Sequence, residues 1–180
     1  MNNQVARSIS EFSRILNLLF IDIFEHTYLS SIAPPPLTKM QFNILKILKI
    51  SGPLLVSEIA DFMQISRSAA SKNIDKLVNY KLVSRKIITT DRRTASVALL
   101  KPGENIVNEF EKLRTKKQDI ALAGFTEKEQ RQLSKLLGKY VSQCLTQEKE
   151  LNLICLKCNG SIGDECALAN HNVKCRFQFS

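Results

Sequence analysis

Two short helical segments separated by a tight turn constrain the fold of this chain more than any other feature. Apolar residues recur at helical spacing in both, namely Ile59, Ala60 and Met63 in the first and Ala70, Ile74, Leu77 and Val78 in the second. Ser57 and Ser66 are well placed to cap these helices, because a serine side chain accepts a hydrogen bond from the first helical turn. A short helix, a turn and a longer helix with small residues at its start predict a helix-turn-helix.

An alternating segment follows the second helix. Residues 82–88 alternate and are rich in β-branched side chains, residues 89–93 are polar, and residues 94–99 alternate again. Two such runs joined by a charged tip predict a β-hairpin, which we call the wing. Pro102 then suits the first turn of another helix.

Further helices are predicted on both sides of this unit. Residues 6–30 carry apolar side chains over more than one stripe, and a run of three prolines ends the segment. Because a helix with so much apolar surface is buried on several sides, this one favours a dimer interface over an ordinary core position. A helix opened by a Thr38–Gln41 capping box and another after Pro102 are also expected. A last one covers residues 127–150, with Cys144 as a small core residue.

The charge of the chain points to a polyanionic partner. It has 26 Lys and Arg against 17 Asp and Glu, a net charge of +9, and 44% hydrophobic residues. Nucleic acid and an anionic membrane surface are the two partners that such a surplus fits. The most apolar stretch, residues 15–24, is too short to span a bilayer, and no secretory signal is visible. We therefore expect a cytoplasmic protein without a membrane partner, in which disulfides are rare.

The outward face of the second helix of the pair has the chemistry of a DNA-reading surface. Small hydroxyl residues let the backbone approach the major groove, and Arg67 and Lys72 can reach guanine acceptors or phosphates. The residues predicted to contact DNA from this helix are Ser66, Arg67, Ser68, Ser71, Lys72 and Lys76. A solvated helix face is the alternative interpretation of the same charges.

Several motifs in order resemble the MarR family of bacterial and archaeal regulators over roughly residues 38–104. They are Gly52-Pro53, Ser57-Glu58-Ile59-Ala60, Ile65-Ser66-Arg67-Ser68, Leu82-Val83-Ser84-Arg85, Asp91-Arg92-Arg93, Val97, Leu99 and Gly103. The chain departs from the family pattern at Leu55 and Leu100, which affects helix capping, and in its cysteine-bearing end.

The resemblance implies how the wing and the outer helices work. Arg93 is then the residue that inserts into the minor groove, Asp91 positions it, and Arg92 meets phosphate. Lys86 and Arg85 on the wing strand add contacts to the DNA backbone. The helices over residues 6–30 and 127–150 form a homodimer that binds a pseudo-palindromic operator in double-stranded DNA, with half-sites about one turn apart.

The expected fold is mainly α (α+β): a winged helix-turn-helix with dimerisation helices at both ends and a small cysteine-rich extension. The expected division is an N-terminal dimerisation helix and linker over 1–36 and the winged domain over 37–103. C-terminal dimerisation helices over 104–150 and a four-cysteine tail over 151–180 complete it.

Four of the five cysteines cluster in this tail, with the spacing Cys-x2-Cys-x7-Cys-x8-Cys. They are Cys155, Cys158, Cys166 and Cys175. Four thiolates suit zinc or an iron–sulfur cluster, and metal binding would supply the folding energy of so short a segment. A zinc ribbon normally has two CxxC knuckles and only one is present here, so we favour an iron–sulfur cluster, [4Fe-4S], with Zn²⁺ as the alternative. His171 is a possible substitute ligand.

Three functions follow from these features. The favoured one is a DNA-binding transcriptional regulator that senses redox, oxygen or metal state through the cysteine centre. The alternative is a regulator of the same fold released by a small lipophilic or aromatic effector, with a structural zinc in the tail. A cysteine-dependent redox enzyme is less favoured, because the chain lacks a Gly-rich phosphate loop, a nucleophile motif and suggestively paired carboxylates.

Overall fold

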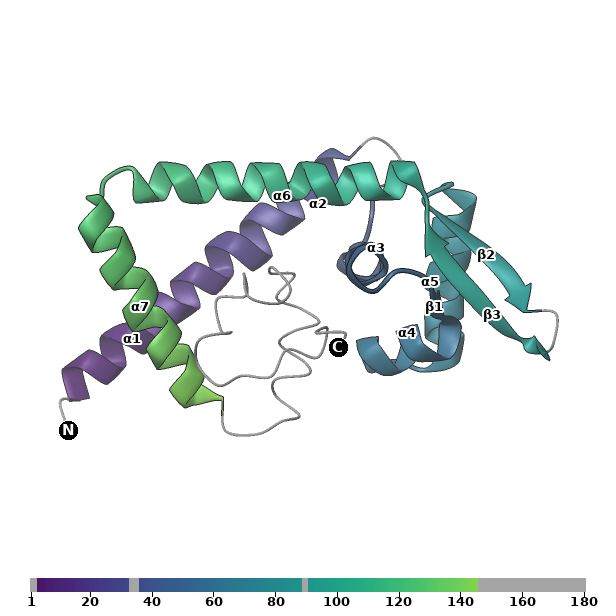
Figure 1. Cartoon of the computed structure of the whole chain (residues 1–180), viewed down its shortest axis with the longest axis horizontal. Helices are drawn as coiled ribbons and strands as arrows, with labels where there is room; N and C mark the ends of the chain where they lie inside the picture. Colours follow the sequence, from purple (N-terminus) through teal and green to yellow (C-terminus); the bar gives the residue numbers. More distant parts are fainter. Residues whose placement is uncertain (1–2, 33–35, 89–90, 146–180) are drawn as a thin grey trace. The chain divides into compact units, whose positions relative to one another are not determined.

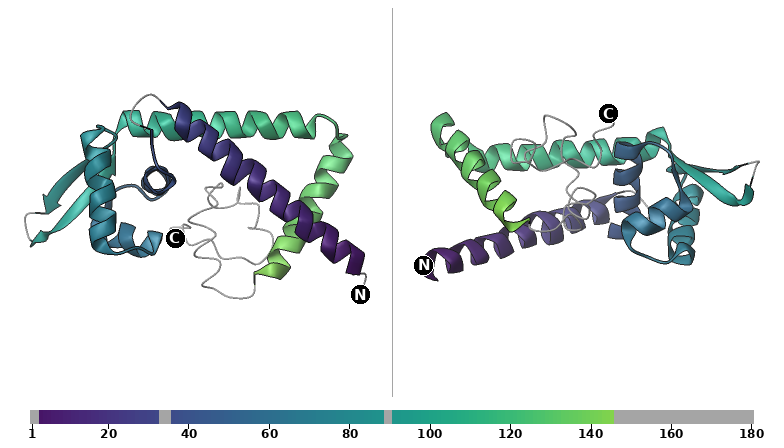
Figure 2. Two further views of the ribbon diagram at one scale, coloured as in Figure 1. Left: turned by 180° about the vertical axis from the view of Figure 1, so that it is seen from behind. Right: turned by 60° about the horizontal axis from the view of Figure 1, so that its bottom comes forward.

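The computed structural model of the chain describes residues 3–32, 36–88 and 91–145, with the backbone alone for residues 3, 87, 88 and 91–94. The chain forms two compact units, Met1–Phe42 and Asn43–Ser180. Figure 1 shows the elements along the chain, and Figure 2 shows them from two further directions.

The first unit is built on one unbroken helical segment. It consists of α1 (Asn3–Asn17), a π-helical stretch η1 (Leu18–Phe24) and α2 (Glu25–Ser31). The helix predicted over residues 6–30 is therefore confirmed. Ile32 leaves the helix in an extended conformation, just before the prolines that prevent its continuation. The rings of Tyr28 and Phe42 pack at a centroid distance of 6.2 Å and help to close this unit.

Helix α3 (Lys39–Ser51) begins with the capping box that the sequence predicted. The backbone N–H of Thr38 donates to Gln41 Oε1 at 2.9 Å, and the N–H of Gln41 donates to Thr38 Oγ1 at 3.3 Å. Gly52 follows the helix with a φ of +73°, a left-handed conformation that glycine adopts without steric cost. Both ends of α3 are thus set by local sequence.

The helix-turn-helix consists of α4 (Val56–Met63) and α5 (Arg67–Asn79). Ser66 caps α5 as expected, since its Oγ accepts from the N–H of Ala69 at 3.2 Å. The predicted cap at Ser57 is wrong: α4 begins earlier, with Leu55 at its N-cap. Glu58 explains the earlier start, because its Oε2 accepts from the N–H of Leu55 at 2.7 Å and so satisfies the cap without a hydroxyl.

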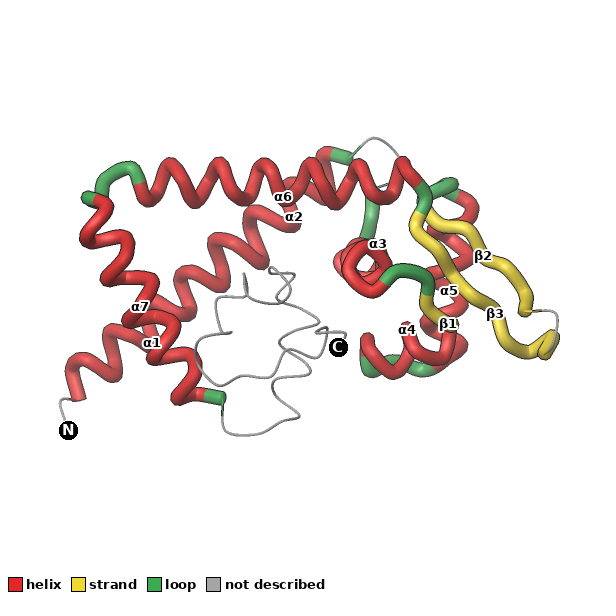
Figure 3. The backbone as a smooth tube through the Cα atoms, viewed as in Figure 1, coloured by secondary structure: helices red, strands yellow, loops and turns green. Residues whose placement is uncertain are grey.

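The wing consists of β2 (Val83–Ile88) and β3 (Asp91–Leu99), joined in an antiparallel sheet of order β1-β3-β2. Figure 3 shows the short β1 (Leu54–Leu55) beside β3. Sequence patterning predicted the hairpin but missed β1, because two residues are too short to show alternation. It also placed residues 91–93 in a loop. Their backbone instead lies in β3, because backbone ladder pairing does not depend on alternating side chains.

The core of the second unit joins the wing to the helix-turn-helix. Ile59, Ala70, Ile74, Leu77, Val83, Val97 and Val107 are almost completely buried. Of the residues predicted to face inward from α5, Ala70, Ile74 and Leu77 are buried and Val78 is half-buried. Helix α5 also contacts β2 directly. The core therefore orients α5 and the root of the wing together.

Two helices complete the second unit: α6 (Lys101–Leu122), with Pro102 in its first turn, and α7 (Glu127–Cys144). Thr126 caps α7, and hydrogen bonds from Thr126 hold the pKa of the Glu129 carboxyl below its ordinary value. Because that pKa is lowered, the contribution of this cap is present at neutral pH and is lost as the pH falls through it. Within residues 3–32, 36–88 and 91–145, no helix is long and apolar enough to cross a membrane.

Gly103 allows α6 to start directly against the sheet. A Cβ at this position would overlap the Leu82 carbonyl oxygen and lie 2.9 Å from Leu99 Cδ1. That carbonyl cannot easily move, because it accepts a hydrogen bond from the N–H of Leu100 at 3.0 Å. We expect Gly103→Ala to lower the free energy of unfolding by about 1–3 kcal/mol.

Gly124→Ala is the matched control for this prediction, since a Cβ there has nothing within 4 Å. It is expected to leave stability unchanged or to raise it by about 0.4–1 kcal/mol. Urea unfolding of both variants measures the difference. Equal stability of the two variants would show that the contact between α6 and the sheet tolerates a methyl group.

Candidate nucleic-acid interface

Helix α5 presents a polar, largely cationic face on the side opposite the core. Arg67, Lys72 and Lys76 are exposed, as are Ser66 and Ser68. The cations therefore project from a helix whose other face is fixed by buried Ala70, Ile74 and Leu77. A helix of this kind can enter a major groove and offer donors to base edges and phosphates.

The start of α5 combines a cap with a positive helix end. Ser66 Oγ accepts from the N–H of Ala69 and lies 3.0 Å from Ser68 Oγ. The hydroxyl of Ser66 is therefore already used in capping, whereas Arg67 beside it is exposed. The positive end of the helix dipole and the Arg67 guanidinium both favour an anion at this turn.

The wing strand β2 adds one exposed cation and one engaged cation. Lys86 is exposed. Arg85 Nη1 donates to Asp75 Oδ1 at 2.7 Å and to Ser71 Oγ at 3.2 Å. Ser71 was predicted from the sequence to contact DNA. It is half-buried, and through its hydrogen bond with Arg85 it takes part in a network that joins α5 to the wing.

Sequence reasoning missed Asp75 as a member of this surface. The signal was present, because Asp75 lies one helical turn after Ser71 and therefore on the same side of α5. Its partner Arg85 comes from a different element, and such a pairing does not show in local sequence.

Several predicted site residues are placed only by their backbone or fall outside the described residues. The backbones of Asp91, Arg92 and Arg93 begin β3, and Asp91 pairs with Ile88 beside an irregularity in the ladder. The four tail cysteines lie outside the described residues. Among the residues that the structure does describe, no group of three or more His, Cys, Asp or Glu side chains is arranged to hold a metal ion.

The long helices of the described residues carry large apolar side chains that are exposed. On α1 and η1 they include Phe12, Ile15, Leu16, Leu18, Leu19, Ile21 and Ile23. On α7 they are Leu133, Leu136, Leu137, Tyr140 and Val141. Cys144, expected in the core, is exposed, and its hydrogen bond with Tyr140 raises the pKa of that hydroxyl. Each of these faces has the composition of a core, yet its side chains are exposed in the part of the chain that the structure describes.

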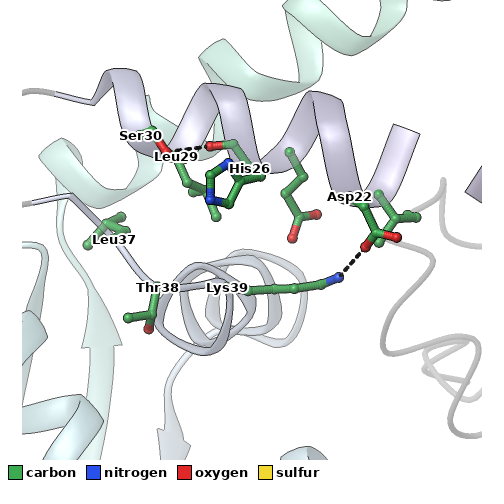
Figure 4. Close-up of a pocket in the computed structure, with 9 residues that line it drawn as sticks. Asp22, His26, Leu29, Ser30, Leu37, Thr38 and Lys39 are labelled. Carbon is green, nitrogen blue, oxygen red and sulfur yellow. Dashed lines mark hydrogen bonds and ion pairs between the residues drawn. The ribbon is translucent and has the colours of Figure 1, made fainter. Parts of the chain in front are cut away.

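A pocket of about 370 Å³ lies within the first unit (Figure 4). Its apolar lining comes from Ile21, Leu29 and Leu37. Its polar lining includes Asp22, which pairs with Lys39 at an Nζ–Oδ1 distance of 3.9 Å. An apolar cavity of this volume with a few polar groups is of the size that holds small molecules.

Comparison with known proteins identifies the family of this fold and surface. The model of the MarR family matches residues 37–95. The HTH-type transcriptional repressor MdtR of Bacillus subtilis (strain 168) is 31% identical over 144 residues, which cover 79% of this chain and 91% of MdtR. The chain belongs to the MarR family. The resemblance noted from motifs over residues 38–104 is thus confirmed, and the chain is a MarR-family transcriptional regulator.

Solved structures of other proteins agree with the fold. The YusO protein from Bacillus subtilis is 29% identical, with a TM-score of 0.62, over 76% of this chain and 96% of YusO. A point mutant of MepR from S. aureus, solved bound to an oligodeoxyribonucleotide, is 19% identical with a TM-score of 0.56, over 76% of this chain and 97% of MepR. The predicted winged helix-turn-helix class and the prediction of a regulator instead of an enzyme are both confirmed.

Proposed function

We propose that this MarR-family regulator binds a pseudo-palindromic operator as a homodimer, with α5 in the major groove and the wing along the neighbouring minor groove. The observation that carries the proposal is the exposed face of α5, with Arg67, Lys72 and Lys76 held opposite a buried apolar face. Lys86 extends the positive surface onto the wing. The MepR structure with bound oligodeoxyribonucleotide shows that this fold accepts DNA, which supports the proposal.

The proposal divides the cations by role, and substitutions test the division. Lys72→Ala, on the helix in the major groove, is expected to weaken operator binding and to relax base preference at one position. The expected loss is about 1–3 kcal/mol, the scale of one specific contact. Arg93→Ala is expected to cost a similar amount, since the family resemblance assigns it to the minor groove. Lys86→Ala is expected to weaken operator and random DNA alike and to reduce the salt slope by about 0.9.

Gel-shift titrations at several salt concentrations measure these effects, on an operator selected from random DNA by the wild-type protein. Lys128→Ala, which removes an exposed cation in the first turn of α7, is the control for a general charge effect. If the three test variants and the control each weaken binding to operator and to random DNA by the same factor, α5 does not read bases and the proposed roles are wrong.

We also propose that the tail holds a [4Fe-4S] cluster through Cys155, Cys158, Cys166 and Cys175, with Zn²⁺ as the alternative. The support is the sequence alone: four thiolates within 21 residues, in a chain whose fifth cysteine stands apart on α7. A cluster would make operator binding respond to oxygen or redox state, whereas zinc would fold the tail without sensing.

The pocket in the first unit favours a second candidate signal. Its apolar lining, with Asp22 and His26 at its edge, suits a small aromatic or lipophilic effector. Such a ligand is expected to release the operator, and Leu29→Trp, which fills the pocket, is expected to abolish that release. A panel of aromatic acids and aromatic cations, assayed for operator release from both proteins, tests this candidate; identical responses would exclude the pocket.

A further inference from the structure

A carboxylate lies among the cations of the surface that faces DNA in the proposed function. Asp75 is on α5 next to Lys76 and one turn after Ser71, and 57% of its side chain is exposed. An exposed carboxylate repels phosphates and lowers affinity for any DNA. Its position therefore needs a reason other than direct contact with the backbone of a duplex.

The reason is its contact with the wing. Arg85 Nη1 lies 2.7 Å from Asp75 Oδ1, and the same nitrogen lies 3.2 Å from Ser71 Oγ. Ser71 Oγ in turn donates to Asp75 Oδ2 at 3.5 Å. The three side chains form a closed network between α5 and β2, and the Arg85 side chain is 33% exposed, so solvent only partly screens the pair.

The network lies near the root of the wing, beside its buried part. Arg85 pairs across the ladder with Val97, which is completely buried, whereas the next pair toward the tip is Lys86 with Ser96. Because side chains alternate along a strand, Arg85 faces α5 and its neighbour Lys86 faces away. β1 still pairs with Ser96, and past the Lys86–Ser96 pair the hairpin is a two-stranded ribbon, which twists more strongly than a broad sheet.

We propose that Asp75 is a positioning residue: its carboxylate holds Arg85 and thereby fixes the angle between the wing and α5. The same ion pair keeps Arg85 away from DNA phosphates, so the operator complex depends less on sequence-independent charge. Asp75 thus raises the preference for the operator over random DNA. This inference rests on the proposed binding of DNA by α5 and the wing.

The test compares Asp75→Asn, Arg85→Gln and the double variant with wild type, on operator and on random duplex over a range of salt. Asp75→Asn frees Arg85, so we expect random-DNA affinity to rise several-fold and the salt slope to steepen by about 0.9. The operator-to-random ratio is expected to fall by up to about fivefold, the factor that matches the strongest partly exposed ion pairs.

Arg85→Gln is expected to lower the ratio without steepening the salt slope, because no cation is released. The double variant is expected to match Arg85→Gln in the operator-to-random ratio, since residues that act through one contact are not additive. Asp75→Glu, which keeps a carboxylate within reach, is expected to restore the wild-type slope. Asp119→Asn is the control variant. It removes the same charge from the last turn of α6, about 27 Å along the helix from Lys101, and is expected to change neither the operator-to-random ratio nor the salt slope.

Two results would overturn the proposal. If Asp75→Asn changes discrimination at a single operator position and leaves the salt slope unchanged, Asp75 accepts a hydrogen bond from a base instead of positioning Arg85. Additive effects of the two single substitutions would likewise exclude a shared role. Failure of the proposed function is separate and visible in wild type, which would then bind operator and random DNA with equal affinity.

Discussion

Leu137→Glu is expected to convert the protein from a dimer into a monomer and to lower operator affinity more than any substitution on α5. Leu137 lies on the apolar face of α7, which is exposed among the described residues. If a second copy covers that face, the new carboxylate becomes buried without a partner. Such a charge costs about 3 kcal/mol or more, which raises the dimer dissociation constant roughly 150-fold or more.

Sedimentation velocity over a range of protein concentrations measures the effect. Phe12→Glu on α1, where the side chain is 63% exposed in the single chain, is expected to give the same result. Gln132→Glu on α7 adds the same charge off the apolar stripe and is expected to leave the dimer intact. If both Leu137→Glu and Phe12→Glu dimerise as strongly as the wild-type protein, these faces do not form the dimer interface.

Cys158→Ser is expected to remove the proposed centre completely and to change operator affinity about 5- to 150-fold, the range of a coupling of about 1–3 kcal/mol. The tail follows α7 directly, and α7 is one of the helices proposed to form the dimer. Loss of the centre would loosen this scaffold and shift the spacing of the two copies of α5, whereas the half-sites are fixed by the DNA turn.

Cys144→Ser is the matched control, because Cys144 is a free, exposed thiol on α7 outside the four-cysteine cluster. It should keep both the centre and the affinity. Iron, sulfide and zinc content and the visible spectrum of anaerobically purified protein are measured together with operator affinity. Protein that contains zinc and is colourless supports the structural alternative, and wild-type operator affinity in a variant without the centre would separate the tail from DNA binding.

Local signals in the sequence predicted most of the winged domain. The Thr38–Gln41 capping box and the Ser66 cap specify their own helix ends, since the interacting groups are three residues apart. The Ser57 cap failed because a glutamate one residue later satisfied an earlier N–H. The sequence therefore predicts a helix end best where only one residue can cap that helix.

Features that depend on distant residues could not be predicted in this way. β1 is a strand only because β3 lies beside it, and the pairing of Asp75 with Arg85 requires α5 and β2 to be packed together. The exposed apolar faces of α1, which includes Phe12, and of α7, which includes Leu136, show the same limit. Helical periodicity identifies an apolar surface but does not tell whether the same chain or a second copy covers it.

The central claim is that two copies of the winged domain bind one two-fold operator. Its most direct test is an affinity measurement on an operator in which one half-site has been scrambled. The affinity of wild-type protein is measured for the selected operator and for the same duplex with one half-site scrambled, at fixed salt. Loss of one half of the base contacts is expected to lower affinity toward that for random DNA. The fall is at least about 30-fold for two or more mismatched pairs. Equal affinity for the two duplexes would contradict dimeric recognition.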